Sequence, residues 1–204
     1  MKLIYSLLLV LAAVMVTGCT AAVVGATATG VAVAMDRRQP DVMAADERIE
    51  WTVQSRISTK FGDQVHINAI SYNRNVLLIG EALTEPIKAE CTKIAEGVDE
   101  VKSVTNELSI AAPSSMGARA NDSYITSEVK ARLVAKAEEV NPLHVKVATE
   151  AGVVYLMGLV TRKEAAVATQ VARTTSGVKR VVRVFEYIPE PKPSSSQPPP
   201  KTGK

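Results

Sequence analysis

The stretch VYLMGLVTRKEA, residues 154–165, joins the end of one predicted element to the start of another. Its first half is an apolar run, which is typical of a strand buried on both faces. Thr161 and Glu164 have the spacing of a capping box, so a helix should begin directly after the strand. Small apolar residues then recur at helical spacing: Ala165, Ala168, Val171 and Ala172. The stretch therefore predicts a buried strand that leads into a capped helix.

An earlier part of the chain has the same organisation. An apolar run, residues 76–79, again ends at a glycine and precedes a helical pattern that carries Ile87, Cys91, Ile94 and Ala95. Other equivalent positions pair Ile49, Val53 and Ile57 with Ile125, Val129 and Leu133, His66 with His144, Gly80 with Gly158, and Gly97-Val98 with Gly177-Val178. Self-similarity on this scale indicates a duplicated module.

Each copy is predicted to contain a helix, two strands, a second helix and a third strand. Apolar residues four apart between Ile49 and Phe61 form one helical stripe, which Gly62 should end. The alternation that starts at Val65 indicates a strand, and Asn73-Arg74-Asn75 is a plausible turn before the apolar run. The fold class is thus α+β, with two helices on one face of a three-stranded mixed sheet in each module.

The two modules are expected at residues 46–111 and 121–188, joined by a linker at 112–120. Gly97 and Gly177 should end the second helices as C′ glycines. The last strands are predicted over residues 101–110 and 181–188. A module of about 65 residues has a small core, so we expect the two copies to stabilise each other.

The N-terminus has the features of a targeting signal. Lys2 precedes an apolar segment, residues 3–16, that is too short to span a bilayer comfortably. The sequence Val16-Thr17-Gly18-Cys19 resembles a bacterial lipobox, which implies cleavage after residue 18 and three acyl chains on Cys19. A thiol is the side chain with the nucleophilicity that a lipid acceptor needs. The alternative, a signal anchor that continues through residue 34, is disfavoured because glycines and threonines interrupt the run.

The residues that follow the lipobox narrow the location further. By resemblance to Gram-negative lipoproteins, Thr20 in place of Asp implies transfer to the outer membrane, facing the periplasm. Residues 19–45 are interpreted as the lipidated start and a tether, although residues 20–34 could equally lie along the membrane surface. The tail, residues 189–204, is rich in Pro, Ser and Lys and is expected to be disordered.

The chain lacks the usual signs of catalysis. It contains two histidines, His66 and His144, which we interpret as half-exposed strand residues without metal-ligating neighbours. Cys91 lies on an apolar helical stripe and is interpreted as a buried hydrophobe. Ser114 and Ser115 have no histidine near them in the sequence, and no GxSxG, Walker or HExxH motif is present. We therefore expect no enzyme, no cofactor and no metal, and a hydrolase with an unrecognised site ranks last.

The two copies differ in charge. Residues 46–110 contain 7 basic and 11 acidic side chains, whereas residues 121–188 contain 10 basic and 7 acidic ones. This difference points to an anionic partner for the second copy, although ordinary solvated surface charge explains it equally well. The net charge of +3 is too small to indicate nucleic acid.

One helix face of the second copy has the composition of an interfacial membrane contact. An exposed aromatic, a small apolar ridge and flanking lysines lie off the core stripe, and the candidate phospholipid-binding residues are Tyr124, Ser127, Lys130, Ala131, Val134 and Lys136. Trp51 has a comparable position in the first copy, but Glu47 and Glu50 beside it favour packing on the second copy or on a protein.

The pattern as a whole is similar to the BON domain, most specifically in VYLMGLVTRKEA and SGVKRV. A lipobox followed by two such domains resembles dual BON-domain outer-membrane lipoproteins, although Tyr124 stands where a family member has Trp. The resemblance implies binding of anionic phospholipid through the second domain, a role in outer-membrane integrity and enrichment at the division site. The alternative function is a periplasmic adaptor for an envelope-assembly or division protein, with lipid serving only as the anchor.

Overall fold

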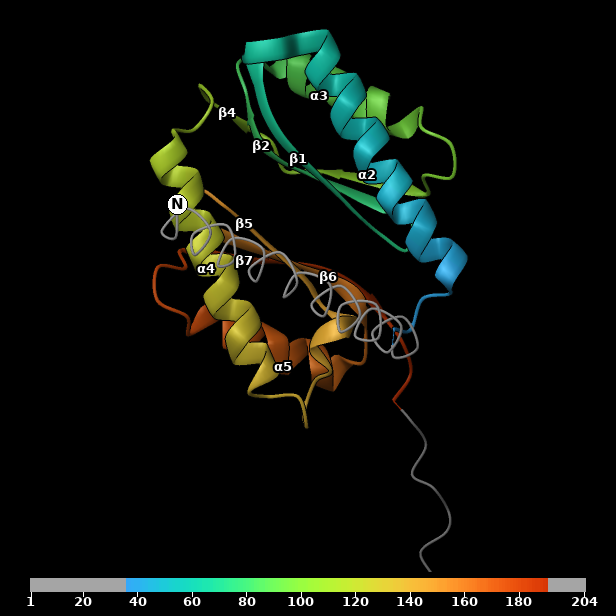
Figure 1. Ribbon diagram of the computed structural model, residues 1–204, viewed down its shortest axis with the longest axis vertical. Coiled ribbons are helices and arrows are strands. Elements are labelled where there is room, and N and C mark those ends of the chain that lie inside the picture. The colour runs from blue at the N-terminus through green and yellow to red at the C-terminus, as the bar shows by residue number, and fades with distance from the viewer. Residues whose placement is uncertain (1–35, 191–204) are drawn as a thin grey trace, which may run out of the picture.

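The computed structural model describes residues 36–190 and contains the module twice (Figure 1). The first module consists of α2 (Pro40–Phe61), the 3₁₀ turn η1 (Gly62–Gln64), β1 (Val65–Tyr72), β2 (Asn75–Ala82), α3 (Glu85–Glu96), β3 (Ser103–Asn106) and β4 (Ser109–Ile110). The second consists of α4 (Met116–Val134), η2 (Pro142–His144), β5 (Lys146–Glu150), β6 (Val153–Val160), α5 (Arg162–Arg173) and β7 (Arg180–Tyr187). The predicted α+β fold class is confirmed.

The apolar runs that decided the sequence interpretation are the central strands of the two sheets. β2 pairs antiparallel with β1 and parallel with β3, and β6 pairs in the same way with β5 and β7. Val76 and Leu78 of β2 pack under the helices of their own module, whereas Leu77 and Ile79 face the other module. The run is apolar throughout because both faces of the strand are buried.

The last strand of the first module differs from the single strand that was predicted. It is divided into β3 and β4, both parallel to β2, so this sheet has four strands. Between them, the Asn106 amide donates a hydrogen bond to the carbonyl oxygen of Lys88 in α3 at 2.8 Å, and Leu108 is buried in the core. These two side chains take the backbone out of the regular alternation of a strand.

Two predictions for the second module are wrong. α5 ends at Arg173, and Gly177 lies in the loop that follows, at φ +83°. A β-carbon at Gly177 would lie 3.1 Å from Ile125 Cδ1, so this glycine serves a close approach and not a helix end. His144 is buried in η2 and is not a half-exposed strand residue, because the chain turns at Pro142 before β5 begins.

Gly80 and Gly158 have the same structural role in the two modules. A β-carbon at Gly80 would lie 2.1 Å from the carbonyl oxygen of His66, and one at Gly158 would lie 2.1 Å from that of His144. No side chain can be accommodated at that distance. The repeated glycine therefore reflects a close approach between backbones that both modules require.

The two sheets pack face to face, and the helices cover their outer sides (Figure 1). Between the sheets lies an apolar cluster of buried side chains: Ile70, Tyr72, Leu77, Ile79, Tyr155 and Met157. Burial of a large apolar side chain contributes roughly 1.5–3 kcal/mol, so a cluster of this size holds the modules in one body. This packing supports the expectation that the copies stabilise each other.

Polar contacts also cross between the modules. Glu186 on β7 accepts hydrogen bonds from the side-chain amides of Asn73 at 3.0 Å and Asn75 at 2.6 Å. Lys146 on β5 forms an ion pair with Glu50 on α2. These contacts fix the register of one sheet over the other, because a shift would leave the partly buried charges unpaired.

The folded part of the chain begins earlier than expected, since α2 starts at Pro40, within the segment assigned to the tether. Arg37 donates two 2.8 Å hydrogen bonds to the carboxylate of Glu164 in the second module. Arg38 forms a 2.8 Å ion pair with Asp46 in the first module. Residues 36–38 are therefore held against both modules.

α4 also begins earlier than expected, at Met116 within the predicted linker. The Ser115 hydroxyl accepts a hydrogen bond from the Ala118 N–H and caps the first turn. Within residues 36–190, no helix combines the length and the hydropathy that crossing a bilayer requires. The expected signal peptide, Cys19 and the last residues of the tail lie outside the described residues.

Candidate functional site

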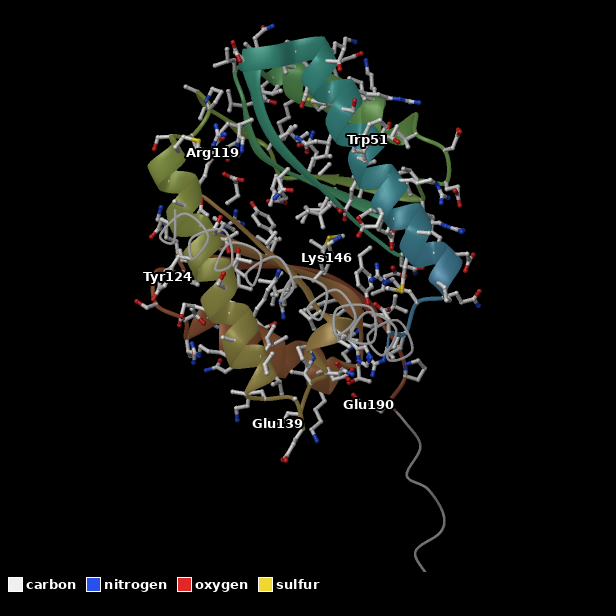
Figure 2. All side chains as sticks on the ribbon, viewed as in Figure 1. Trp51, Arg119, Tyr124, Glu139, Lys146 and Glu190 are labelled. Atoms are coloured by element: carbon white, nitrogen blue, oxygen red, sulfur yellow. The ribbon has the colours of Figure 1, made fainter. Side chains whose placement is uncertain are left out.

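The predicted contact face of the second module lies on the outer side of α4. Ile125, Val129 and Leu133 are buried against the sheet. The six candidate residues, Tyr124, Ser127, Lys130, Ala131, Val134 and Lys136, are all exposed. Tyr124 has 62% and Val134 has 61% of its surface exposed, and Figure 2 shows Tyr124 directed away from the body of the protein. A face with this composition, turned wholly to the outside, is suited to a membrane surface or a partner.

The structure extends this face by two turns toward the N-terminus. Met116 is 79% exposed and lies on the same side of α4 as Tyr124 and Val134, since positions 116, 120, 124, 127, 131 and 134 share one side of a helix. Sequence analysis missed Met116 because it placed this residue in the linker. The helical spacing to Tyr124 would have revealed it. We call Met116, Tyr124, Ala131 and Val134 the α4 ridge.

Two of the predicted contact residues have local roles in the structure. Lys136 lies beyond the end of α4 and forms a 2.7 Å ion pair with Glu139. The Ser127 hydroxyl donates to the carbonyl oxygen of Ser123, one turn earlier in the helix, at 2.9 Å. Lys130 is exposed on α4. Of the predicted polar residues, Lys130 is thus the one that flanks the α4 ridge within the helix itself.

A buried carboxylate fixes α4 to the sheet beneath it. Asp122 has 5% of its surface exposed and accepts hydrogen bonds from the N–H groups of Ala151 at 2.9 Å and Gly152 at 2.8 Å. Both residues have positive φ in the turn between β5 and β6. The carboxylate therefore positions the α4 ridge and stabilises an otherwise unfavourable turn.

The first module contains the same device. Asp46 is buried in α2 and accepts hydrogen bonds from the N–H groups of Asn73 at 2.8 Å and Arg74 at 2.7 Å. These two residues form the turn between β1 and β2, again with positive φ. Asp46 and Asp122 therefore have the same structural role in the two modules, which the apolar pattern of the sequence did not reveal.

Much of the positive charge of the second module lies away from α4. A cavity of about 490 Å³ near the start of β7 is lined by Arg173, Lys179, Arg180 and Arg183, together with Thr169 and two valines. We call this the β7 basic patch. It offers a second place where an anion could be held, so a test of lipid binding has to separate it from the α4 ridge.

Trp51 does not pack on the second copy. It lies on α2 with 74% of its surface exposed, and Figure 2 shows it on the outer side of the first module. That part of the earlier expectation is wrong for Trp51 itself, because the modules meet mainly through their sheets and α2 contacts the second module through Glu50 instead. Contact of Trp51 with another protein remains open.

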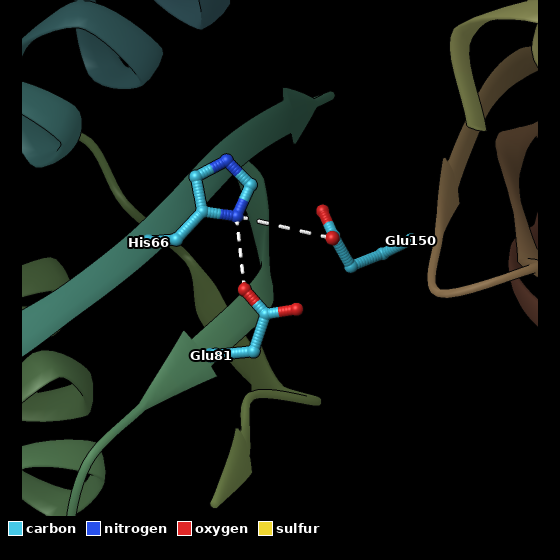
Figure 3. A group of neighbouring side chains, drawn as sticks. All are labelled: His66, Glu81 and Glu150. Carbon is cyan, nitrogen blue, oxygen red and sulfur yellow. Dashed lines mark hydrogen bonds and ion pairs between the residues drawn. The ribbon is translucent and has the colours of Figure 1, made fainter. Parts of the chain in front are cut away.

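His66 has close acidic neighbours, which corrects the interpretation that it lacks potential metal ligands. Its Nδ1 lies 3.0 Å from Glu81 Oε2 and 3.8 Å from Glu150 Oε1 (Figure 3). Ser114 Oγ lies 3.4 Å from the same nitrogen, so the fold brings this serine close to a histidine that is distant in the sequence. Serine and carboxylate share one ring nitrogen, whereas a proton relay needs them on opposite nitrogens. The arrangement therefore does not activate Ser114 as a nucleophile.

Glu150 is held in an unfavourable environment for a charge. Burial, reinforced by the negative charges of Glu81 and Asp122, raises the pKa of Glu150 to about 7, and Arg119 offsets only a part of this. Arg119 donates to the carbonyl oxygen and the hydroxyl of Ser114. Three buried carboxylates, those of Glu81, Asp122 and Glu150, therefore lie near Arg119 at this place.

Comparison with known proteins identifies the family. The family model described as BON domain matches residues 45–112 and 121–189. The chain therefore belongs to the BON-domain family and contains two of its domains in tandem, as the sequence pattern indicated.

Similar proteins match most of the chain. The outer membrane lipoprotein DolP of Haemophilus influenzae is 36% identical over 87% of this chain and 92% of its own length. The 21 kDa hemolysin of Actinobacillus pleuropneumoniae is 33% identical over 76% of this chain and 80% of its own length. Osmotically-inducible protein Y of Escherichia coli is 37% identical over 52% of this chain and 54% of its own length.

Proposed function

We propose that this protein is a non-enzymatic lipoprotein of the outer membrane, anchored through Cys19, whose second BON domain binds anionic phospholipid. The similarity to a protein named outer membrane lipoprotein DolP supports the location, as does the lipobox-like sequence that ends at Cys19. The α4 ridge is the observation that carries the lipid contact. A role in membrane integrity and enrichment at the division site remain predictions from the family resemblance.

The composition of the ridge is suited to the interface between head groups and acyl chains. Tyr124 offers an apolar ring with a polar end, which is favoured at that depth. Met116 and Val134 add exposed apolar surface on the same side, and burying each such side chain contributes roughly 1.5–3 kcal/mol. Lys130 adds about 1 kcal/mol near an anionic surface. Together these contacts are sufficient for reversible docking of a chain that is already tethered by its lipids.

A vesicle sedimentation assay tests the contact. The chain from residue 19, with Cys19→Ser to remove the anchor, is mixed with vesicles of phosphatidylglycerol and phosphatidylethanolamine, or with neutral phosphatidylcholine vesicles. We expect Tyr124→Glu to weaken binding to the anionic vesicles at least tenfold, since it loses apolar burial and adds a negative charge. Trp51→Glu is the matched control, because it changes an equally exposed aromatic on the other module.

A double variant separates the ridge from the β7 basic patch. Arg173→Glu with Arg183→Glu should weaken binding less than Tyr124→Glu if the α4 ridge is the contact. Equal pelleting of wild type and Tyr124→Glu would reject the ridge. Mass spectrometry of the protein from its native membrane tests the anchor, and an unmodified, uncleaved N-terminus would contradict it.

A periplasmic adaptor that binds an envelope protein is the second candidate, and exposed Trp51 favours it. The residue lies on the acidic helix α2, where an anionic membrane surface would be repelled. Photo-crosslinking in cells from positions 51 and 124 discriminates between the two functions. A protein adduct from both positions, together with no affinity for vesicles, would favour the adaptor.

A further inference from the structure

Three ionisable side chains from both modules meet at the domain junction. His66 comes from β1, Glu81 from β2 and Glu150 from β5, and Figure 3 shows all three directed toward a common point. Each contributes one potential ligand atom, and these atoms lie within 4.8 Å of one another. The cluster is independent of the α4 ridge, and nothing in the proposed lipid contact requires it.

The spacing of these atoms agrees with a metal site. Ligands around a tetrahedral zinc ion, at bond lengths of about 2.0–2.1 Å, lie roughly 3.3 Å from one another. The distances from His66 Nδ1 are 3.0 Å to Glu81 Oε2 and 3.8 Å to Glu150 Oε1, one slightly below and one slightly above that value. The two carboxylates lie no more than 4.8 Å apart, so their side chains would have to move closer together to share one ion with His66.

Glu150 provides a separate indication of a ligand, because contacts within the described residues do not satisfy its carboxylate. The residue has 7% of its surface exposed, and its Oε1 atom, which faces His66, has no hydrogen-bond partner among the described residues. A buried carboxylate oxygen without a partner costs several kcal/mol, so it is normally paired or bound to a metal.

The charges around the cluster favour a cation. Glu81, Glu150 and Asp122 are all buried acidic residues, and the facing elements contribute Arg119 of α4 and the imidazole of His66. Arg119 is engaged with Ser114, as described above. A divalent ion would neutralise the two carboxylates of the cluster.

The surroundings also provide support and access. The Ser114 N–H donates to Glu81 Oε2 at 3.2 Å and helps to orient this carboxylate. Such contacts behind a ligand are a usual part of metal sites. A cavity of about 590 Å³ between the modules is lined by His66 and Glu150, so an ion and a water molecule could reach them from outside.

We propose that His66 Nδ1, Glu81 and Glu150 bind one divalent transition-metal ion, with zinc as the best match, and that this ion joins the two BON domains. An imidazole ligand disfavours calcium and magnesium, while zinc is bound both by histidine nitrogen and by Asp or Glu oxygen. Three protein ligands leave a fourth position for water from the cavity. Because the ligands come from both modules, the ion would stabilise their relative orientation.

Calorimetric titration of zinc into the chelator-stripped mature chain tests the proposal. We expect one ion per chain, and a melting temperature that rises by roughly 5–10 °C at a zinc concentration 100 times Kd. Glu150→Gln and Glu81→Gln should each weaken zinc binding more than tenfold. Glu138→Gln, an exposed carboxylate outside the cluster, is the matched control and should leave binding unchanged.

Loss of zinc binding in these variants reports on the ligands and not on unfolding of the protein. Glu150→Gln keeps the shape of the side chain and removes a buried charge, so circular dichroism should show a folded protein. His66→Gln tests the same ion from the other module. With cobalt in place of zinc, wild type should show the visible absorption of a tetrahedral site, and each ligand variant should lose it. Zinc binding that is absent, or equal in wild type and all three ligand variants, would overturn the proposal.

Discussion

Removal of the Asp122 carboxylate should loosen the turn beneath α4 and destabilise the second module. In Asp122→Ala, the N–H groups of Ala151 and Gly152 lose acceptors at 2.9 Å and 2.8 Å. The Gly152 N–H is buried and would be left without a partner at a cost of about 1–3 kcal/mol, whereas Ala151 is exposed and water can replace part of its hydrogen bond. The strained conformation of Ala151, at φ +51°, is present in wild type as well, so it does not add to this loss.

The expected loss is therefore about 2–3 kcal/mol in the free energy of unfolding. Single domains of this size are stable by about 5–15 kcal/mol, so the variant should still fold. Asp122→Asn retains one acceptor oxygen and should lose about half as much. Asp99→Ala, which removes an exposed carboxylate from a loop of the first module, is the control and should change stability by less than about 0.5 kcal/mol.

Urea unfolding followed by circular dichroism measures the loss, and native-state hydrogen exchange locates it. The amides of Ala151 and Gly152 should be protected in the wild type and should exchange much faster in Asp122→Ala. A loss below about 1 kcal/mol, with unchanged protection of both amides, would refute the argument that this carboxylate holds the turn and, through it, α4.

Two further outcomes follow from single contacts. Gly158→Ala would place a β-carbon 2.1 Å from the carbonyl oxygen of His144, and we expect a loss of about 3 kcal/mol or a fall of roughly 6–12 °C in the melting temperature. Gly117→Ala in helix α4 is the control, because its β-carbon would meet only Ser115 Oγ at 3.9 Å. This variant should not destabilise the protein. Equal melting temperatures for Gly158→Ala and Gly117→Ala would contradict this reasoning. Burial alone would raise the pKa of Glu164, but hydrogen bonds from Arg37 and from the Thr161 N–H outweigh it and hold the pKa below its usual value. When the pKa of a carboxylate is lower in the folded than in the unfolded state, its ionised form stabilises the fold at pH values above the unfolded-state pKa. This stabilisation is lost as the pH falls through the folded-state pKa. Arg37→Ala should therefore cost about 1–3 kcal/mol at pH 7 and clearly less at pH 3. Urea midpoints at the two pH values measure this, and a cost that is the same at both would speak against the ion pair.

The parts of this protein that could be predicted from sequence depend on local periodicity. The strand residues 76–79 and 153–157, the capping box at Thr161 and Glu164, and the buried stripe from Ile125 to Leu133 were all identified correctly. Each is a relation between residues a few positions apart, which the geometry of one helix or strand determines. The outward position of Tyr124 follows from the same relation.

Tertiary structure decided which surfaces meet. The sequence shows that Leu77 and Ile79 belong to an apolar run, but only the packed sheets show that they face the second module. His66 and Glu81 lie opposite each other on the paired strands β1 and β2, but Glu150 comes near them only because the second sheet packs over the first. The same is true of Arg37 and Glu164. Local sequence determines the elements, whereas contacts between distant residues arise only when those elements bury their remaining apolar faces against each other.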